Sequence, residues 1–319
     1  MHPVYRLVFF LFLVVLLSGC TTRTYRKPAI EWSAESVELK QVPFYPQTRY
    51  QCGPASLASI LNSSGLDVDL KNLVDEVYLP GRKGTLQVEI IAAVRRYGRV
   101  PYQIDQNPKS IMDQLEQGLP VLVLLNLGYK LIPTYHYAVV IGYEPVKDMM
   151  ILRSGRNYRL LMPRQQFLSA WRKTANWGLT VLPPGHVPDV VDVARYLSAV
   201  IVLESIGQWR AAELSYAAVL KKWPANTLAR FGLANTLLAQ GKLDEAAVQY
   251  RKVLAQDTRH KPARNNLADI LLRLGRCGEA VTVLEPALIS GDSESDIDRA
   301  ISTTQMEIQE SCFDSLTVH

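Results

Sequence analysis

The feature that most constrains the fold is an internal repeat of 34 residues in the C-terminal half of the chain. Gly207, Gly241 and Gly275 recur at this spacing. Alanines and leucines keep the same register, namely Ala212, Ala246, Ala280, Leu220, Leu254 and Leu288. A fixed period of this length is typical of stacked helix pairs. Since one pair cannot bury its apolar face alone, the pairs are expected to share a continuous core and to form a concave surface.

This period resembles the tetratricopeptide repeat (TPR). We expect three units near residues 193–226, 227–260 and 261–294, followed by a capping helix from Ser293 to Ser311 within the terminal segment 295–319. TPR arrays bind extended peptides or partner helices in their concave face, so the resemblance implies a protein partner or a protein substrate there.

The preceding region, residues 41–182, mixes helical and strand patterns. Apolar residues at helical spacing predict helices over Cys52–Asn62, Val88–Tyr97 and Ile111–Gln117, the last with Ser110 as its N-cap. Apolar runs predict strands over Val121–Leu127, Tyr137–Tyr143 and Met149–Arg153. Helices followed by an antiparallel sheet indicate an α+β domain, and a proline-rich linker at residues 183–192 separates it from the repeats.

The first nineteen residues form a targeting segment, in which Arg6 precedes the apolar run Leu7–Leu17. Leu17-Ser18-Gly19-Cys20 resembles a bacterial lipobox. The resemblance implies that Cys20 is lipidated and anchors the protein to a membrane, with residues 20–40 as a tether. Thr21 after the cysteine resembles an outer-membrane signal, which implies a cell-envelope protein facing the periplasm. The alternative is an ordinary cleaved secretion signal with an incidental cysteine.

Composition excludes several classes of partner and cofactor. The formal net charge of +5 is spread along the chain without a basic stripe interleaved with aromatics, so nucleic acid is not an expected partner. The chain has four cysteines, no CxxC pair and five histidines, and we expect no metal site and no cofactor. In an exported protein Cys277, expected between the helices of the third unit, and Cys312, expected after the capping helix, could form a disulfide; the alternative is two unpaired thiols.

Cys52 and His136 carry the expected chemistry. Cys52-Gly53-Pro54 opens a helix, and Pro54 suits its first turn, so the sulfur lies at the positive helix end, which lowers a thiol pKa. His136 begins a strand between Tyr135 and Tyr137, which are expected to point away from it. The competing interpretation is a buried small Cys and a hydrogen-bonded core His.

Three sequence segments resemble the bacteriocin-processing, papain-like cysteine peptidase domain of double-glycine-leader exporters. They are Cys52-Gly53-Pro54-Ala55, the strand His136–Tyr143, and Gln117-Gly118-Leu119-Pro120-Val121. Together with the lipobox and the repeats, they resemble the stand-alone lipoprotein subset of that family. The resemblance implies that Cys52 is the nucleophile, that His136 is the base, and that Gln47 shapes the oxyanion hole, with Gln51 as the alternative.

The sequence departs from the family at the third catalytic position. An Asp is expected after the histidine hairpin, but the chain reads Ile151-Leu152-Arg153-Ser154-Gly155, so Ser154 occupies that place, with Asn157 or Asp148 as alternatives. A serine can orient an imidazole but cannot stabilise its cation by charge. The expected function is a cysteine peptidase. The alternatives are a non-catalytic scaffold and a peptidoglycan-cleaving cysteine amidase. Such amidases generally have a second polar ring residue after the first histidine.

Overall fold

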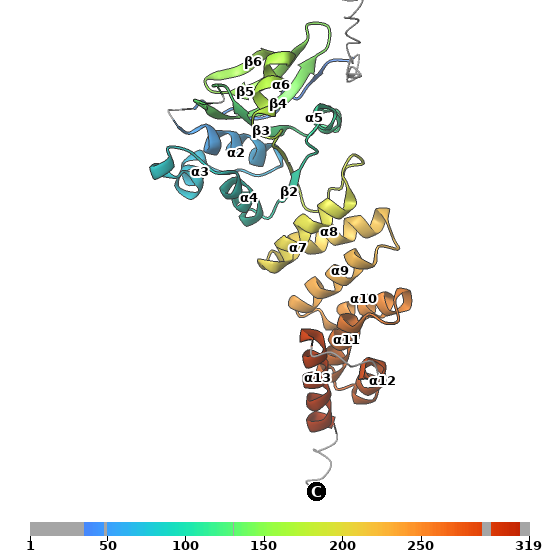
Figure 1. Ribbon diagram of the computed structural model, residues 1–319. Helices are drawn as coiled ribbons and strands as arrows, with labels where there is room; N and C mark the ends of the chain where they lie inside the picture. Colours follow the sequence, from blue (N-terminus) through green and yellow to red (C-terminus); the bar gives the residue numbers. More distant parts are fainter. Residues whose placement is uncertain (1–34, 48–49, 130, 289–294, 313–319) are drawn as a thin grey trace, which may run out of the picture. The chain divides into compact units, whose positions relative to one another are not determined.

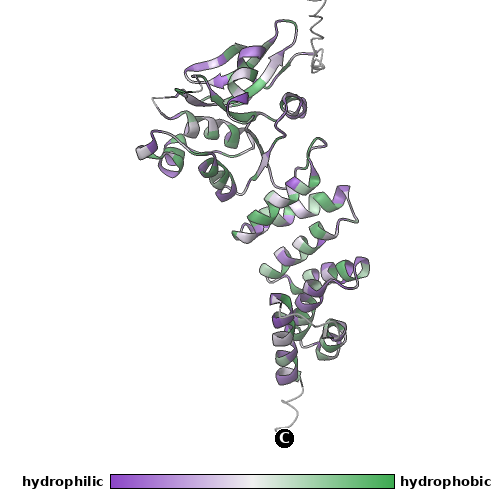
Figure 2. Cartoon of the chain, viewed as in Figure 1, coloured by the Kyte–Doolittle hydropathy of each residue, from purple (hydrophilic) through white to green (hydrophobic). Residues whose placement is uncertain are grey.

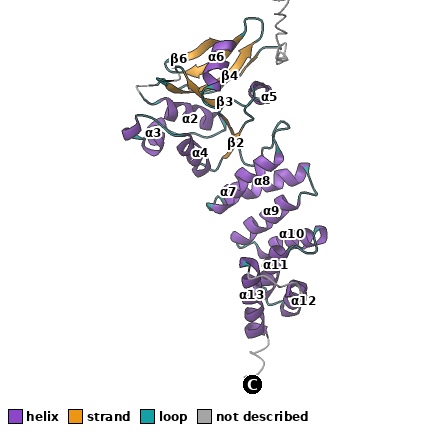
Figure 3. Ribbon diagram, viewed as in Figure 1, coloured by secondary structure: helices purple, strands orange, loops and turns teal. Residues whose placement is uncertain are grey.

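The computed structural model describes residues 35–47, 50–129, 131–288 and 295–312. The predicted lipidation site Cys20, the leader 1–19 and most of the tether lie outside these residues. Figure 3 shows that every described strand precedes the linker and that only helices follow it. Within the described ranges, none of the helices combines the length and the apolar character that a membrane crossing requires.

The N-terminal domain is built on one antiparallel sheet. Its strands are β1 (Val37–Glu38), β2 (Val100–Gln103), β3 (Val121–Asn126), β4 (Tyr135–Glu144), β5 (Met149–Ser154), β6 (Asn157–Pro163) and β7 (Gly178–Leu182). They follow the order β2-β7-β3-β4-β5-β6, and β1 pairs with β4 beside a bulge between Val140 and Gly142. A Cβ at Gly142 would lie 2.1 Å from the carbonyl oxygen of Val37, so only glycine lets the two backbones approach this closely.

The central strand β3 is a buried apolar run, as its composition predicts, although it ends at Asn126 rather than at Leu127. The Asn126 side chain accepts hydrogen bonds from the backbone N–H groups of Gly128 and Thr134, both at 3.0 Å. A side chain that satisfies backbone donors in this way fixes a loop, so it ends the strand one residue early.

Helices cover the sheet. They are α2 (Cys52–Ser63), α3 (Leu70–Val77), α4 (Gln87–Arg96), α5 (Pro108–Glu116) and α6 (Arg164–Arg172), with a single 3₁₀ turn η1 (Pro80–Arg82). Figure 1 shows α2, α3 and α4 gathered on one side of the sheet. The expected N-cap Ser110 is wrong, because Pro108 starts α5 earlier and Asn107 accepts a hydrogen bond from the Ser110 N–H at 3.0 Å. The domain is therefore α+β, as predicted.

The repeat region consists of helix pairs. Its helices are α7 (Val193–Ser205), α8 (Trp209–Lys222), α9 (Thr227–Ala239), α10 (Leu243–Gln256), α11 (Lys261–Arg273), α12 (Cys277–Leu288) and α13 (Asp296–Cys312). Gly207, Gly241 and Gly275 follow the first helix of each pair with φ of +79°, +73° and +70°, a conformation that favours glycine. Hydrophobic and hydrophilic residues alternate along these helices in Figure 2, as stacked amphipathic pairs require.

Polar side chains connect successive pairs at the side of the core. The Tyr216 hydroxyl donates to Glu204 at 2.6 Å, and the Tyr250 hydroxyl donates to Asn235 at 2.7 Å. Asn235 in turn donates to Glu204 at 3.1 Å. A Cβ at Gly232 would lie 2.3 Å from the Tyr216 ring, so this glycine admits the ring between the two pairs. These bonds link the two helices within each pair, and Asn235 also links the second pair to the first.

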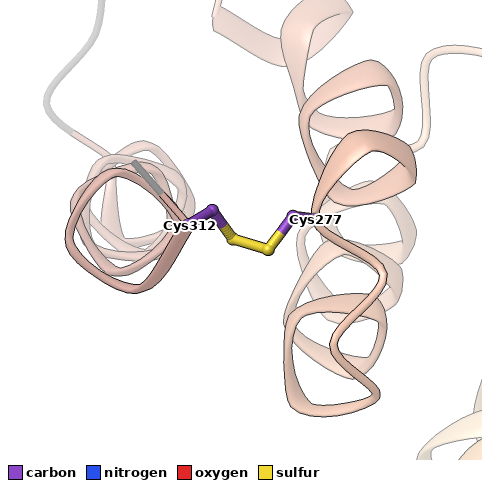
Figure 4. The surroundings of a disulfide bond; sticks show 2 residues. All are labelled: Cys277 and Cys312. Carbon is purple, nitrogen blue, oxygen red and sulfur yellow. A yellow bond between two sulfur atoms is a disulfide. The ribbon is translucent and has the colours of Figure 1, made fainter. Parts of the chain in front are cut away.

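A disulfide closes the last helix onto the array. Cys277 and Cys312 are bonded, with their Cα atoms 5.9 Å apart (Figure 4). Cys277 is the first residue of α12, and Cys312 is the last residue of α13. The expectation that Cys277 lies between helices and Cys312 after the capping helix is therefore wrong, because both belong to helices. The bond fixes the end of α13 against the start of α12.

Candidate active site

Cys52, His136 and Gln47 line one cleft of about 920 Å³ in the N-terminal domain. The three residues come from the start of α2, from β4 and from the segment before α2, so the fold brings together residues that are far apart in sequence. In the part of the chain that the structure describes, no three His, Cys, Asp or Glu side chains are grouped so that they could hold a metal ion.

Cys52 is the first residue of α2 and is half-buried. Burial is the largest influence on its thiol and raises its pKa above the ordinary value of 9.0. Backbone N–H groups of Tyr137, Gly53 and Cys52 act in the opposite direction, because they stabilise the thiolate. The expectation that the helix start lowers this pKa is therefore wrong in net direction, since burial outweighs the N–H groups.

The glycine after the cysteine shapes the wall of the cleft. A Cβ at Gly53 would lie 2.5 Å from the side chain of Thr85, so only glycine lets Thr85 pack against the start of α2. The Tyr137 hydroxyl donates to the backbone oxygen of Thr85 at 3.3 Å, and Tyr137 is buried. Residue 85 and β4 therefore meet beside the thiol, and both line the cleft.

His136 is the second residue of β4 and pairs with Leu125 of β3. Its Nε2 lies 2.8 Å from the hydroxyl oxygen of Ser154, the last residue of β5. Burial lowers the pKa of the imidazole below the ordinary 6.5. Since Ser154 occupies Nε2, Nδ1 is the ring nitrogen left to exchange a proton within the cleft.

The three candidates for the orienting residue occupy different places. Ser154 is buried and contacts His136 directly. Asn157 is exposed at the start of β6, and the structure does not place it in the cleft. Asp148 lies in the turn at the far end of the β4–β5 hairpin and pairs with Arg164 at 2.5 Å. Ser154 is the candidate that the fold brings to the imidazole.

The two candidate glutamines also differ. Gln47 lines the cleft, and its backbone N–H donates to the carbonyl oxygen of Gly155 at 3.0 Å, which ties the segment before α2 to the residue after Ser154. Gln51 is the N-cap residue of α2 and is absent from the described residues that line the cleft. The structure therefore brings Gln47, rather than Gln51, to the site.

The two tyrosines on either side of His136 contribute to the same cleft. Tyr135 and Tyr137 line the cleft together with His136. Tyr135 is exposed, whereas Tyr137 is buried and its ring forms a T-shaped pair with that of Trp177 at a centroid distance of 6.0 Å. Tyr137 forms part of the wall, because its backbone also contacts the thiol.

Sequence reasoning missed Arg153, which precedes Ser154 in β5 and binds neighbouring backbone segments to that strand. It is buried, and its guanidinium donates to the carbonyl oxygens of Val42 at 3.1 Å and Lys40 at 2.9 Å, and to that of Tyr158. These bonds attach the chain ahead of Gln47 to β5 immediately before Ser154. The signal was present as a single arginine in the otherwise apolar strand of residues 149–153.

Sequence comparison identifies both regions. Residues 39–178 match the Peptidase_C39 like family, and residues 197–261 and 237–302 match tetratricopeptide repeats. The resemblance to double-glycine-leader peptidases with C-terminal repeats is thereby supported at the level of the family. No curated protein matches the chain in sequence.

Three solved structures illustrate what parts of the chain are similar to. A putative C39-like peptidase from Bacillus anthracis is 18% identical, with 46% of this chain and 98% of that chain covered at a TM-score of 0.40. The peptidase domain of Streptococcus ComA, a bi-functional ABC transporter, is 23% identical, with 47% and 97% covered at 0.34. The Yersinia enterocolitica type III secretion translocator chaperone SycD is 16% identical, with 39% and 88% covered at 0.36. By these family matches, the chain is similar to the Peptidase_C39 like family over residues 39–178 and to tetratricopeptide repeats over residues 197–302.

Proposed function

We propose that the chain is a cysteine peptidase that hydrolyses peptide bonds with Cys52 as nucleophile and His136 as base. The observation that carries the proposal is the shared cleft, in which the start of α2 presents Cys52 and Ser154 holds His136 by its Nε2 at 2.8 Å. A nucleophile beside a base that a third group orients is the arrangement that covalent catalysis requires.

In the resting site, burial favours a neutral thiol and a neutral imidazole, since it raises the pKa of Cys52 and lowers that of His136. The tautomer that suits catalysis has Nε2–H donating to Ser154, which leaves the lone pair of Nδ1 free to take a proton. Nδ1 then accepts the thiol proton while Sγ attacks the carbonyl carbon of the peptide bond. His136 acts as a general base rather than as one half of a preformed ion pair.

The tetrahedral oxyanion needs donors directed at it. The side-chain amide of Gln47 and the backbone N–H groups at the start of α2 would supply them. Collapse breaks the C–N bond as imidazolium returns its proton to the leaving amine, and a thioester on Cys52 remains. Water, deprotonated by His136, then attacks the thioester and breaks the C–S bond. The acid product leaves, and the imidazolium returns its proton to the thiolate of Cys52.

A second function has a specific observation in its favour, namely a peptide-binding scaffold that does not turn over. Ser154 cannot stabilise imidazolium by charge, and both members of the pair favour their neutral forms. A scaffold would still use the cleft and the repeats. It would show no dependence of thiol reactivity on His136, whereas a peptidase would.

The location and the role of the repeats are part of the same proposal. We expect Cys20 to carry lipid, to bind the membrane and to hold the protein in the cell envelope, at the outer membrane facing the periplasm. The repeats, in units at residues 193–294, would bind a protein substrate or partner in their concave face. The proposed chemistry uses groups of the protein and water and requires no cofactor, and nucleic acid is not a proposed partner.

Labelling of Cys52 tests the peptidase directly. A peptide-like electrophile, such as a peptidyl vinyl sulfone, should modify Cys52 at least about a hundredfold faster in the native protein than in the His136→Gln variant, since the imidazole activates the thiol. Iodoacetamide, which lacks a peptide portion, serves as the matched reagent, and mass spectrometry locates the adduct. Equal rates in native protein, unfolded protein and the variant would reject the peptidase and favour the scaffold.

A further inference from the structure

The cleft that contains Cys52 is lined by four cationic side chains. Arg82 and Lys83 come from η1 and the residue after it, Arg156 from the turn between β5 and β6, and Lys173 from the position directly after α6. No Asp or Glu belongs to the described residues that line the same cleft. The positive charge therefore comes from three separate segments and has no compensating carboxylate in the wall.

The cations of the cleft differ in their pairing from other arginines of the domain. Arg159 forms ion pairs with Glu38 and Glu144, both at 2.8 Å, and Arg164 pairs with Asp148 at 2.5 Å. Within the described ranges, the four cleft cations make no ion pair with a carboxylate.

Two of the four have neutral partners. Lys173 donates to the carbonyl oxygen of Gly128 at 2.7 Å, and Lys83 lies 6.0 Å from the centroid of the Tyr50 ring. A carbonyl oxygen or a ring face leaves the full positive charge in place. Both side chains therefore still contribute to the potential of the cleft.

Clefts concentrate an electrostatic field, because their low-dielectric walls keep field lines in the solvent-filled space. Like charges gathered without counter-charges repel one another, and a bound anionic ligand relieves that repulsion. The chain as a whole has a formal net charge of only +5, so the charge of the cleft is a local property.

We propose that this cleft selects polypeptide segments that carry Asp or Glu side chains near the bond presented to Cys52. The inference rests on the proposed function, because it names the substrate class of the same site. Leu86, Leu124 and Tyr137 also line the cleft and give it an apolar wall, which suits the aliphatic parts of a peptide. Acidic residues would be held at the rim by charge, while neighbouring apolar residues pack against the wall.

Binding to the full chain carrying Cys52→Ala tests the inference without turnover. The probes are fluorescent peptides of about twelve residues with four Glu, or with Gln or Lys at the same four positions. We expect the Glu peptide to bind about tenfold more tightly than the Gln peptide and the Lys peptide to bind most weakly. The preference should fall as salt rises, because the charges are exposed.

Charge removal supplies the matched comparison. In the same background, Arg82→Gln, Lys83→Gln and Arg156→Gln together should lower the affinity for the Glu peptide about tenfold and leave that for the Gln peptide unchanged. The control variant combines Lys71→Gln, Lys109→Gln and Lys147→Gln, three exposed lysines of the same domain that do not line the cleft, and it should bind like the parent.

Two results would overturn the inference. One is equal affinity for the Glu, Gln and Lys peptides, and the other is a single-stranded oligonucleotide of the same charge that competes as well as the Glu peptide. Selective binding of the Glu peptide supports the inference even if wild-type protein never cleaves it, in which case the peptidase alone fails. Thiol labelling that depends on His136, without a preference for acidic peptides, leaves the peptidase standing and rejects the substrate class.

Discussion

The two regions of this chain are specified by their sequence in different ways. In the repeats, Gly207, Gly241 and Gly275 end equivalent helices at a fixed period, and each pair packs on its neighbours. In the N-terminal domain, Cys52 and His136 line one cleft and Ser154 contacts His136, because β4 and β5 pair beside the start of α2. Local periodicity thus determines the repeats, whereas long-range strand register determines the site. Changes to the site should alter chemistry, and changes to the repeats should alter stability.

The largest expected effect is on the rate at the site. His136→Gln should lower peptide hydrolysis about 10²–10⁴-fold, because it removes the base, and Gln47→Ala should lower it about 10²–10³-fold by removing an oxyanion donor. Gln51→Ala is the matched control and should stay close to wild type. Steady-state kinetics measures these rates, and a larger loss for Gln51→Ala than for Gln47→Ala would reverse the assignment of the oxyanion donor.

The next largest effect concerns the end of the repeats. The double variant Cys277→Ser, Cys312→Ser should lose about 2–4 kcal/mol of unfolding free energy, since the disulfide restricts the unfolded chain between the two cysteines. Urea unfolding followed by circular dichroism measures the loss. The rate of Cys52 labelling should stay the same, and a parallel fall in that rate would show that the two regions are coupled.

Packing between repeats should give a smaller change. Gly232→Ala should cost about 1–3 kcal/mol, because its Cβ would lie 2.3 Å from the Tyr216 ring. Gly278→Ala is the matched control in α12, where a Cβ meets no atom within 4 Å, and it should be neutral or stabilising. Equal losses in the two variants, measured by urea unfolding, would contradict the packing account.

The smallest effect is a pH dependence that belongs to the site. Burial holds the pKa of His136 below 6.5, so the unfolded chain binds a proton before the folded chain does as the pH falls. The stability associated with neutral His136 is therefore complete above pH 6.5 and is lost below it, as the pH falls toward the folded pKa. Between pH 7.5 and 5.5, wild type should lose more unfolding free energy than His136→Gln. An equal loss in both proteins would show that His136 is not shielded from protonation.

Sequence reasoning predicted the repeats well because their signals are local. Glycines that adopt positive φ and alanines buried at crossings recur at 34 residues, and α8, α10 and α12 carry the repeated alanines Ala212, Ala246 and Ala280, each fully buried. The buried strands β3, β4 and β5 were predicted equally well, because their continuous apolar runs are typical of strands buried in a core.

Three of the strands that were missed share a physical reason. The strands β2 and β7 are only four and five residues long, and β6 is an edge strand with mostly exposed side chains, so none of them has a periodic apolar signal. The net rise of the Cys52 pKa was missed because it depends on burial of the thiol in the folded domain, which no local sequence pattern reveals. The same holds for Arg153, whose partners Lys40 and Val42 lie far along the chain.

The measurement that tests the central claim most directly is peptide cleavage by the wild-type protein, Cys52→Ala and His136→Gln, followed by mass spectrometry of a mixed peptide library. Wild type should produce new peptide termini, Cys52→Ala should produce none, and His136→Gln should produce them far more slowly. Cleavage by Cys52→Ala at the wild-type rate, or a library left intact by wild type while Cys52 also resists the peptide-like electrophile, would contradict the account.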